Sequence, residues 1–140
     1  PTFAPEHFAR VRQVDTMKRK QFIKGINQIA QEGAIQIFQE FNTGMEEIIV
    51  GVVGVLQFDV LKYRLENEYN VEIRMDNLPY EHIRWIENED INMDKIVGTS
   101  DMKKIQDLKG RPLLLFVNSW SVGMVLDRNE GLVLSEFGRE

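Results

Sequence analysis

The stretch IIVGVVGVLQFDVLKYRL, residues 48–65, decides how the surrounding sequence can fold. Its apolar part, residues 48–56, has nine residues including two glycines, whereas a helix that crosses a bilayer needs about 20 apolar residues. A membrane-spanning helix is therefore excluded here. The apolar run instead favours a buried strand that turns at Gly54. Beyond the turn, an amphipathic helix is predicted by apolar side chains three or four residues apart, namely Phe58, Leu61, Leu65 and Tyr69.

The sequence before this stretch predicts a strand, a helix and a hairpin. Ala9 and Val11 alternate with arginines, which is the two-residue period of a half-buried strand. Asp15 or Thr16 can cap the following helix, whose apolar side chains recur at helical spacing, and Gly33 supplies its stop. A turn-like segment then separates two further strands. The expected elements are a strand at 8–14, a helix at 16–33, a strand at 34–41, a turn at 42–45 and a strand at 46–53.

After the second helix, residues 71–76 alternate again and close the unit as a fourth strand. The resulting order, β-α-β-β-α-β, is that of the ferredoxin-like fold, which packs both helices on one face of a four-stranded antiparallel sheet. We therefore expect an α+β protein whose residues 1–79 form a ferredoxin-like two-layer sandwich.

Residues 80–140 predict a second, smaller α/β subdomain. Strands are favoured at 82–87 and at 112–117, the latter because it is a continuous apolar run. A helix follows that Ser119 or Ser121 could cap. The other expected elements are a short helix or ordered loop at 99–110 ended by Gly110, the helix itself at 119–129, and a final strand at 132–137.

The sequence offers few residues for catalysis or metal binding. It contains no cysteine, which excludes disulfides, thiolate zinc sites and cysteine nucleophiles. Its two histidines, His7 and His82, each stand beside a glutamate but lack the i, i+4 spacing of a helical metal site. Neither the Gly-rich P-loop pattern that holds nucleotide phosphates nor the G-x-S-x-G nucleophile motif is present. We therefore expect no catalytic, metal-binding or cofactor-binding residue in this segment.

Charge is distributed unevenly along the chain. The net charge is −5, yet residues 1–35 carry about +3 and the remainder about −8. Lys18, Arg19 and Lys20 stand in the first turn of the predicted helix, where exposed cations oppose the positive end of the helix dipole at a cost of about a few tenths of a kcal/mol each. An anionic partner would remove that cost. We hypothesise that this helix start, together with Arg10 and Arg12, faces nucleic acid or an acidic protein, although a solvated surface is the commoner explanation of such a run.

Two RNA-binding folds and a metabolite-binding domain are the alternatives. The RNA-recognition motif has the same order of elements but stacks bases on aromatic residues of its third strand, and residues 46–54 contain none. The tetrad Gly51-Val52-Val53-Gly54 has the GXXG pattern of KH domains, but it ends a strand and its two valines suit burial. A polar pocket between these glycines and the first helix would favour a regulatory domain that binds a small molecule.

Two longer stretches, residues 3–38 and 48–72, and a short one at residues 84–87 contain motifs that periodicity does not explain. These motifs are Phe3-Ala4-Pro5-Glu6, Lys24-Gly25, Glu32-Gly33-Ala34, Val50-Gly51, the run from Val53 to Val60, Arg64-Leu65, Glu68-Tyr69-Asn70-Val71 and Arg84-Trp85-Ile86-Glu87. Together they resemble the C-terminal domain, domain III, of bacterial peptide chain release factor 3, a family of translational GTPases. The resemblance covers most of the chain. It is looser in the last three predicted elements, which are a strand, a helix and a final strand.

The resemblance implies a role for the domain in translation termination. Members of the family help to recycle class I release factors from the ribosome in a GTP-dependent manner, and they carry a GTPase domain and a β-barrel domain upstream. The implied function is therefore a cytoplasmic ribosome-binding and coupling domain. Its implied partners are small-subunit protein and rRNA, the upstream GTPase and barrel domains and, indirectly, class I release factors, with no membrane partner.

No cofactor is implied for this segment itself, because GTP or GDP with Mg²⁺ belongs to the GTPase domain that this sequence does not contain. The family motif does not identify the residues that contact the ribosome. Gly51, Gly54 and Phe58 are best explained by the fold. Gln57 and Asp59 are polar at the start of the second helix, and they join the basic residues as candidate contacts, although an acidic residue is also favourable there for electrostatic reasons alone.

Overall fold

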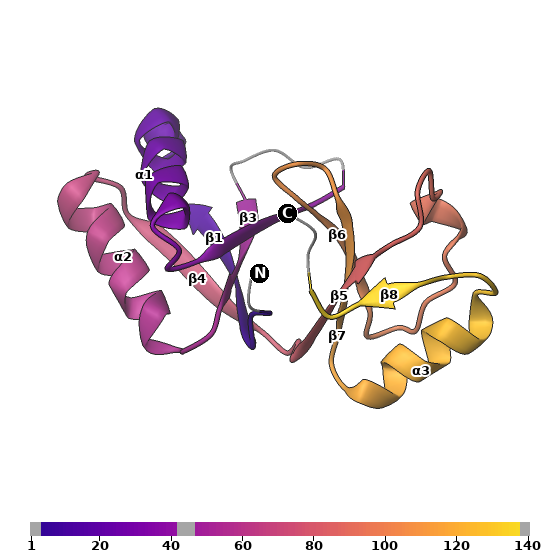
Figure 1. Cartoon of the computed structure of the whole chain (residues 1–140). Coiled ribbons are helices and arrows are strands. Elements are labelled where there is room, and N and C mark those ends of the chain that lie inside the picture. Colours follow the sequence, from indigo (N-terminus) through magenta and orange to yellow (C-terminus); the bar gives the residue numbers. More distant parts are fainter. Residues whose placement is uncertain (1–3, 42–46, 138–140) are drawn as a thin grey trace.

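The computed structural model describes residues 4–41 and 47–137, and in them an eight-stranded antiparallel sheet carries helices at both ends of the molecule (Figure 1). The strand order is β4-β1-β3-β2-β6-β7-β5-β8. The strands are β1 (His7–Gln13), β2 (Gln36–Glu40), β3 (Glu47–Val52), β4 (Ile73–Leu78), β5 (His82–Ile86), β6 (Lys103–Asp107), β7 (Pro112–Phe116) and β8 (Leu134–Ser135). The helices are α1 (Arg19–Gln31), α2 (Leu56–Glu68) and α3 (Ser119–Arg128), with 3-10 turns at Thr16–Lys18 and Met93–Lys95.

The first half of the chain has the ferredoxin-like arrangement that its sequence predicts. β1 lies between β3 and β4, and β2 pairs with the outer side of β3. α1 and α2 lie side by side on one face of these strands (Figure 1). Ala9 and Val11 point into the core under the helices, where they meet fully buried side chains such as Phe22 of α1 and Leu65 of α2. The predicted α+β fold is thus confirmed, whereas the predicted turn at 42–45 lies outside the described residues.

Local chemistry explains where α1 begins and ends. The Asp15 side chain accepts a hydrogen bond of 2.9 Å from the backbone N–H of Met17, so that Asp15 rather than Thr16 caps the turn that leads into the helix. Gly33 has a φ of +84°, the left-handed conformation that glycine adopts readily after a helix. Within α1, Gly25 allows α2 to approach closely, because a Cβ there would lie 2.7 Å from Cδ2 of Leu65.

The stretch that decides the fold forms β3, a tight corner and α2. β3 is buried from Ile48 to Val52, and a Cβ on Gly51 would lie 2.8 Å from the ring of Pro5. Close backbone approach therefore explains this glycine, as expected. At the corner, Oε1 of Gln57 accepts hydrogen bonds of 3.1 Å from the backbone N–H groups of Val53 and Gly54. Of the two central valines of the tetrad, Val52 is buried but Val53 is 51% exposed. The expectation that both valines suit burial was therefore wrong for Val53.

The second half of the chain extends the same sheet. β6 pairs with β2, with Glu40 opposite Ile105, and β7, β5 and β8 follow. The prediction of a helix or loop at 99–110 was wrong, because residues 103–107 form β6. Only Ile105 of this strand is buried, so its sequence lacks the apolar alternation of a half-buried strand. Gly110, at a φ of +80°, turns the chain between β6 and β7 instead of ending a helix.

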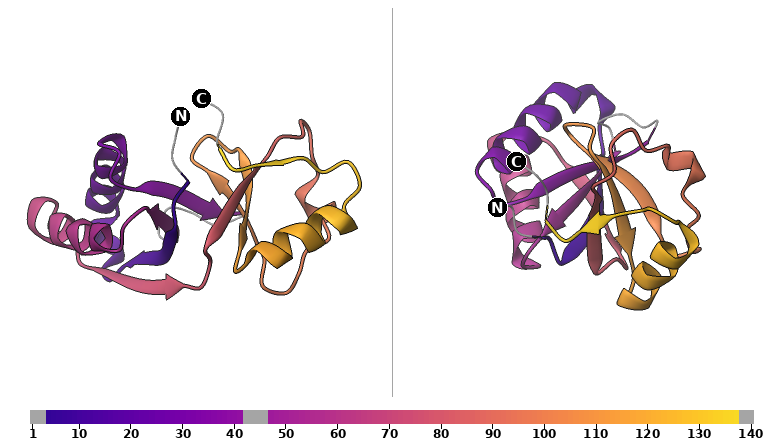
Figure 2. Two further views of the ribbon diagram at one scale, coloured as in Figure 1. Left: turned by 60° about the horizontal axis from the view of Figure 1, so that its bottom comes forward. Right: turned by 45° about the vertical axis from the view of Figure 1, so that its right-hand side comes forward.

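The two halves of the sheet face one another across a shared core. Phe8, Phe38 and Ile49 of the first half are buried with side chains of β5, β6 and β7, and the rings of Phe8 and Phe38 lie 6.4 Å apart. The opposite face of the second half packs against α3 through a third cluster that includes Leu114 and Val125. The order through the molecule is therefore helices, sheet, sheet, helix, as the further views show (Figure 2). The boundary near residue 79 stays a prediction.

The last elements differ from the prediction in detail. The cap of α3 is neither Ser119 nor Ser121 but Asn118, whose side chain accepts a hydrogen bond of 3.0 Å from the backbone N–H of Ser121. The Ser121 hydroxyl is buried and donates to Asp101. The final strand is shorter than the expected 132–137 and comprises only Leu134–Ser135.

Candidate functional site

The basic helix start, defined as Lys18, Arg19 and Lys20, lies where the sequence predicts it. α1 has no acidic residue in its first turn, and no side chain caps its first residue. Arg19 and Lys20 are exposed and Lys18 is half-buried. In the described part of the chain, neither lysine has an ion-pair partner. The two lysines are thus cations at the unfavourable end of a helix dipole, with no carboxylate in direct contact.

Lys18 and Lys20 have different surroundings. Lys18 lines a shallow cavity of about 410 Å³ together with Glu66 and Glu72, so carboxylates near it reduce the local positive potential. Lys20 does not line this cavity. Of the two lysines, Lys20 is therefore better placed to meet an anion that arrives from solvent.

Arg10 and Arg12 lie on the other face of the sheet. Because Ala9 and Val11 point towards the helices, these arginines point away from them. Arg10 is paired with Glu40 at 2.9 Å and with Glu47 at 2.8 Å. Arg12 is paired with Asp76 at 2.9 Å. The structure thus does not bring these arginines together with the basic helix start, and it compensates their charges internally.

Glu40 connects both halves of the sheet electrostatically. It accepts from Arg10 of β1 and lies 2.6 Å from Nζ of Lys103 of β6. Partial burial raises the pKa of the Glu40 carboxyl, but the hydrogen bonds and charges of Lys103 and Arg10 outweigh burial and hold the pKa below its usual value. This cluster therefore ties β1, β2 and β6 together.

Gln57 and Asp59 lie at the far end of α2 from the basic helix start. The cavity beside Lys18 is lined by Glu66 and Asn70, near the end of α2, whereas Gln57 and Asp59 belong to its first turn. Thirteen helical residues span about 20 Å. The side-chain oxygen of Gln57 already accepts two hydrogen bonds within the corner, and Asp59 is exposed. The candidate contacts therefore do not form one compact site.

The outward side of α2 is a surface that the sequence reasoning missed. Leu56, Val60 and Tyr63 follow one another at i, i+4 and i+7 and are 74%, 50% and 66% exposed. Their stripe lies opposite the buried side of the helix, which carries Phe58, Leu61 and Leu65. The spacing was visible in the sequence. α2 is therefore apolar on two opposite sides and not simply amphipathic as predicted.

A groove of about 870 Å³ adjoins this helix. It is lined by the start of β1, the first two turns of α2 and the segment from the end of β4 to the start of β5. Both histidines line it, as do Val55 and Asp59. No group of three or more His, Asp or Glu side chains within residues 4–41 and 47–137 is arranged to hold a metal ion.

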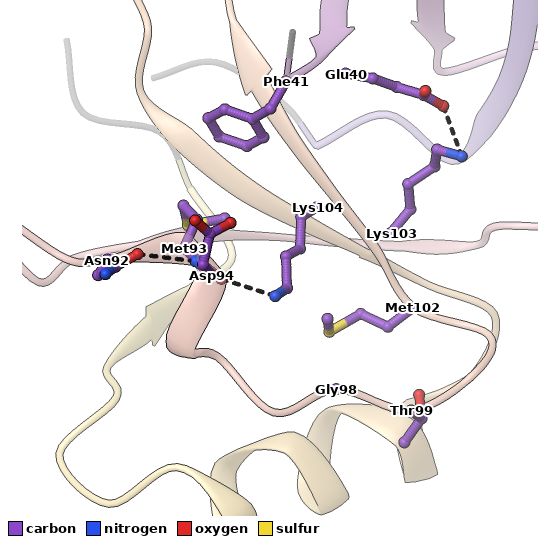
Figure 3. A pocket seen from close by; sticks show the side chains of 10 residues that line it. All are labelled: Glu40, Phe41, Asn92, Met93, Asp94, Gly98, Thr99, Met102, Lys103 and Lys104. Carbon is purple, nitrogen blue, oxygen red and sulfur yellow. Dashed lines mark hydrogen bonds and ion pairs between the residues drawn. The ribbon is translucent and has the colours of Figure 1, made fainter.

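A second pocket, of about 670 Å³, lies between the end of β2, the start of β6 and the turn at Met93–Lys95 (Figure 3). Its polar groups bind one another: Lys103 pairs with Glu40, and Nζ of Lys104 donates a hydrogen bond of 2.7 Å to the carbonyl oxygen of Met93. The Asn92 side chain accepts from the backbone N–H of Asp94. These contacts pair Lys103 and Lys104 within the domain.

Within residues 4–41 and 47–137, the surfaces and cavities described above lack the features expected of an RNA-recognition motif and of a metabolite-binding domain. The sheet face that an RNA-recognition motif would expose is buried here, because Phe8, Phe38 and Ile49 are at most 2% exposed. The cavities described above do not lie between Gly51 or Gly54 and α1. In the described residues, no helix has both the length and the apolar character that membrane crossing requires.

The helix starts lack the glycine-rich P-loop pattern that holds nucleotide phosphates. A phosphate cradle needs free backbone N–H groups at a helix N-terminus. Side-chain oxygens of Asp15, Gln57 and Asn118 already accept from backbone N–H groups at the turn before α1, at the start of α2 and at the start of α3. Some backbone N–H groups near these helix starts are therefore already paired, while no side chain caps the first residue of α1 or of α2 itself.

The fold and these surfaces together define the chain as an α+β domain with a ferredoxin-like half, a basic helix start and an exposed apolar side of α2. The family model described as "Class II release factor RF3, C-terminal domain" matches residues 1–126. The chain belongs to this family.

Curated relatives carry the name peptide chain release factor 3. The protein of Symbiobacterium thermophilum is 46% identical over 95% of this chain. Those of Streptococcus mutans and Listeria welshimeri are 42% and 41% identical over 97% and 96% of it. This chain spans about a quarter of the length of each relative, 25% to 26%.

Proposed function

We propose that this chain is the ribosome-binding and coupling domain of a translation termination factor that recycles class I release factors from the ribosome in a GTP-dependent manner. Family membership supports the link to termination. GTP and Mg²⁺ would be bound by a GTPase domain in the rest of such a protein, because the sequence of this chain contains no P-loop pattern. The proposed partners of the whole protein are the small ribosomal subunit and, indirectly, class I release factors.

The observation that carries this proposal is the basic helix start. Lys18 and Lys20 stand at the positive end of the α1 dipole, in a chain whose net charge is −5. An anionic partner would relieve this arrangement, and rRNA phosphate is such a partner. Among the candidate contacts we favour Lys20 over Arg10 and Arg12, because the charges of both arginines are already paired within the domain.

Coupling requires unequal contact with two states of the factor, because a domain that binds both states equally shifts neither. A rigid connection between surfaces would allow such coupling. α1 and α2 are locked together by the close approach at Gly25 and by Arg64 of α2, whose guanidinium pairs with Glu32 at the end of α1 and with Glu68. A contact at one end of this helical layer is therefore mechanically linked to the other end.

The test is co-sedimentation of the 140-residue chain with ribosomes, with full-length factor as competitor. We expect salt-sensitive binding that the competitor displaces. Lys18→Glu with Lys20→Glu should weaken it and lower the slope of log K against log salt by about one for each phosphate that the variant no longer binds. Lys20→Glu alone should cause much of the same loss of ribosome binding. Because Lys20 does not line the cavity that contains carboxylates beside Lys18, this loss cannot arise from a change among those carboxylates.

The matched control is Lys109→Glu, which makes the same charge change at an exposed turn between β6 and β7. It should leave binding unchanged. Binding of the double variant equal to that of the unchanged chain at low salt would refute the basic helix start as the contact. If the chain binds neither ribosomes nor the factor's own GTPase domain, the proposed function is refuted.

A further inference from the structure

The outer edge of β4 is an open strand edge. β4 stands at one end of the strand order and pairs, among the described strands, with β1 alone. It has six residues, Ile73–Leu78, and runs along the border of the molecule (Figure 2). Every second residue of such a strand directs its backbone N–H and C=O groups away from the sheet, where a further strand can bind them. The strand at the opposite end of the sheet, β8, has only two residues and offers much less.

The face of β4 that points away from the helices carries an unbalanced charge. Arg74 lies directly opposite Arg12 of β1, and like charges in this position destabilise a sheet. Arg12 reaches diagonally to Asp76, at 2.9 Å. Arg74 is exposed, and within residues 4–41 and 47–137 it has no carboxylate in an ion pair. A strand added beside β4 would balance this face if it placed a carboxylate opposite Arg74.

The sequence of β4 itself provides such a strand. When two copies of β4 pair antiparallel about a two-fold axis at Met75, Arg74 of each copy lies directly opposite Asp76 of the other, so that the ion pair forms twice. Opposite residues share one face of a sheet, which is the face that also carries Arg12. A register shifted by two residues would instead set Arg74 against Arg74 or Asp76 against Asp76. The charges of β4 therefore select one register of self-pairing.

The helix side of β4 leaves space beside the strand. Met75 and Asn77 line the groove of about 870 Å³ together with Asp59 and Lys62 of α2. Asn77, Asp59 and Lys62 are exposed, and Met75 is half-buried against the first core cluster. In the two-fold arrangement the Met75 side chains of both copies meet at the axis, and methionine adapts well to such an irregular contact.

We propose that the β4 edge binds a second copy of this chain by antiparallel β4–β4 pairing centred on Met75. The two eight-stranded sheets join into one continuous sheet, with ion pairs between Arg74 and Asp76 on both sides of the axis. The interface differs in its residues from the basic helix start. The proposal therefore goes beyond the proposed ribosome contact and does not depend on it.

The first test uses the absence of cysteine from the sequence. Met75→Cys places a single thiol at the axis, where the Cα atoms of opposite residues are about 4.5–5.5 Å apart, within the range that a disulfide spans. Mild oxidation of the 140-residue chain should convert most of this variant into a disulfide-linked dimer, seen by non-reducing electrophoresis. Asn77→Cys is the matched control on the same side of β4. Its two thiols lie about 13 Å apart along the strand direction, so it should link much more slowly although its position is more exposed.

The second test reverses the charges and follows self-association by sedimentation equilibrium. Arg74→Asp and Asp76→Arg should each raise the dissociation constant of the dimer by about tenfold, because two attractive cross-strand pairs become repulsive. An equimolar mixture of these two variants should associate again, since each then offers the charges that the other lacks. Lys109→Asp, at an exposed turn, is the control and should leave the dissociation constant unchanged. All three positions are exposed, and thermal denaturation checks that every variant is folded.

Three results would overturn the proposal. The first is an unchanged chain that stays monomeric up to millimolar concentration. The second is disulfide formation at equal rates in Met75→Cys and Asn77→Cys. The third is self-association that both charge variants retain undiminished, which would place the contact on another surface, such as the exposed apolar side of α2.

Discussion

α1 and α2 have the same length and pack on the same face of the sheet, yet their outer surfaces differ. Both bury three large apolar side chains in the first core cluster. The outer side of α1 carries charged and amide side chains, whereas the outer side of α2 carries the exposed apolar residues Leu56, Val60 and Tyr63, here called the α2 face. Because α1 has already buried its apolar surface and α2 has not, the fold alone explains α1 but not the exposed side of α2.

The largest expected effect compares the two sides of α2. Leu65→Ala removes a fully buried side chain and should lower the free energy of unfolding by about 2–5 kcal/mol. Leu56→Ala, on the same helix at a 74% exposed position, should change it by no more than about 0.5 kcal/mol. Urea denaturation of the 140-residue chain measures both. Equal losses would show that the α2 face is packed within the domain, contrary to the comparison.

A smaller effect tests how tightly the two helices are joined. Gly25→Val places methyl groups where even a Cβ would lie 2.7 Å from Leu65 and 2.9 Å from Tyr69, so it should lower the free energy of unfolding by about 1–3 kcal/mol. The control is Gly123→Ala in α3, where nothing lies within 4 Å of the new methyl group. This change should raise stability by up to about 1 kcal/mol. A neutral Gly25→Val would mean that the helices separate easily.

The smallest effect concerns the ion pair between the helices. Arg64 lowers the pKa of the Glu32 carboxyl from 4.5, first through the hydrogen bond between them. A lowered folded-state pKa contributes stability above the unfolded value, and this contribution is lost as the pH falls through the folded value. Glu32→Gln should therefore be less stable than the unchanged chain at neutral pH and equally stable in acid.

Thermal denaturation as a function of pH and salt measures this difference. High salt should reduce it, because the pair is exposed. Glu66→Gln, on the exposed side of α2, removes a carboxylate without removing this pair and serves as the control. A difference between Glu32→Gln and the unchanged chain that persists undiminished in acid, well below the folded-state pKa of Glu32, would contradict the ion-pair explanation.

The spacing of apolar residues correctly predicted those helices and strands that bury one side in the core. Alternation at Ala9 and Val11 identified β1, and the spacing of Phe22, Ile26 and Ile29 identified α1. β6 was not predicted, because only Ile105 of this strand is buried and its sequence therefore shows no apolar alternation. Contacts with distant residues stabilise it as a strand, such as the pair between Lys103 and Glu40. Local propensity carries no information about an ion pair whose members are more than sixty residues apart.

The sequence predicted where the basic candidate residues lie in the secondary structure. It did not predict which of them are already paired with carboxylates. The cap at Asp15 or Thr16 and the spacing of the apolar residues placed the basic helix start. That Arg10 meets Glu40, 30 residues away, follows from strand order and could not be read from local spacing. The α2 face could have been found, because Leu56, Val60 and Tyr63 are visible in the sequence at helical spacing. It was overlooked because one apolar stripe already explained the helix.

The pairing of β2 with β6 has a consequence for synthesis of the chain. Glu40 pairs opposite Ile105, so the outer edge of β2 stays open until about 65 further residues have been made. At 5–20 residues per second this takes about 3–13 s. During that interval Phe8, Phe38 and Ile49 lack the strands that later cover them. The nascent chain therefore passes through a stage with an open strand edge and a bare aromatic surface, which is the stage at which a holding chaperone would matter most.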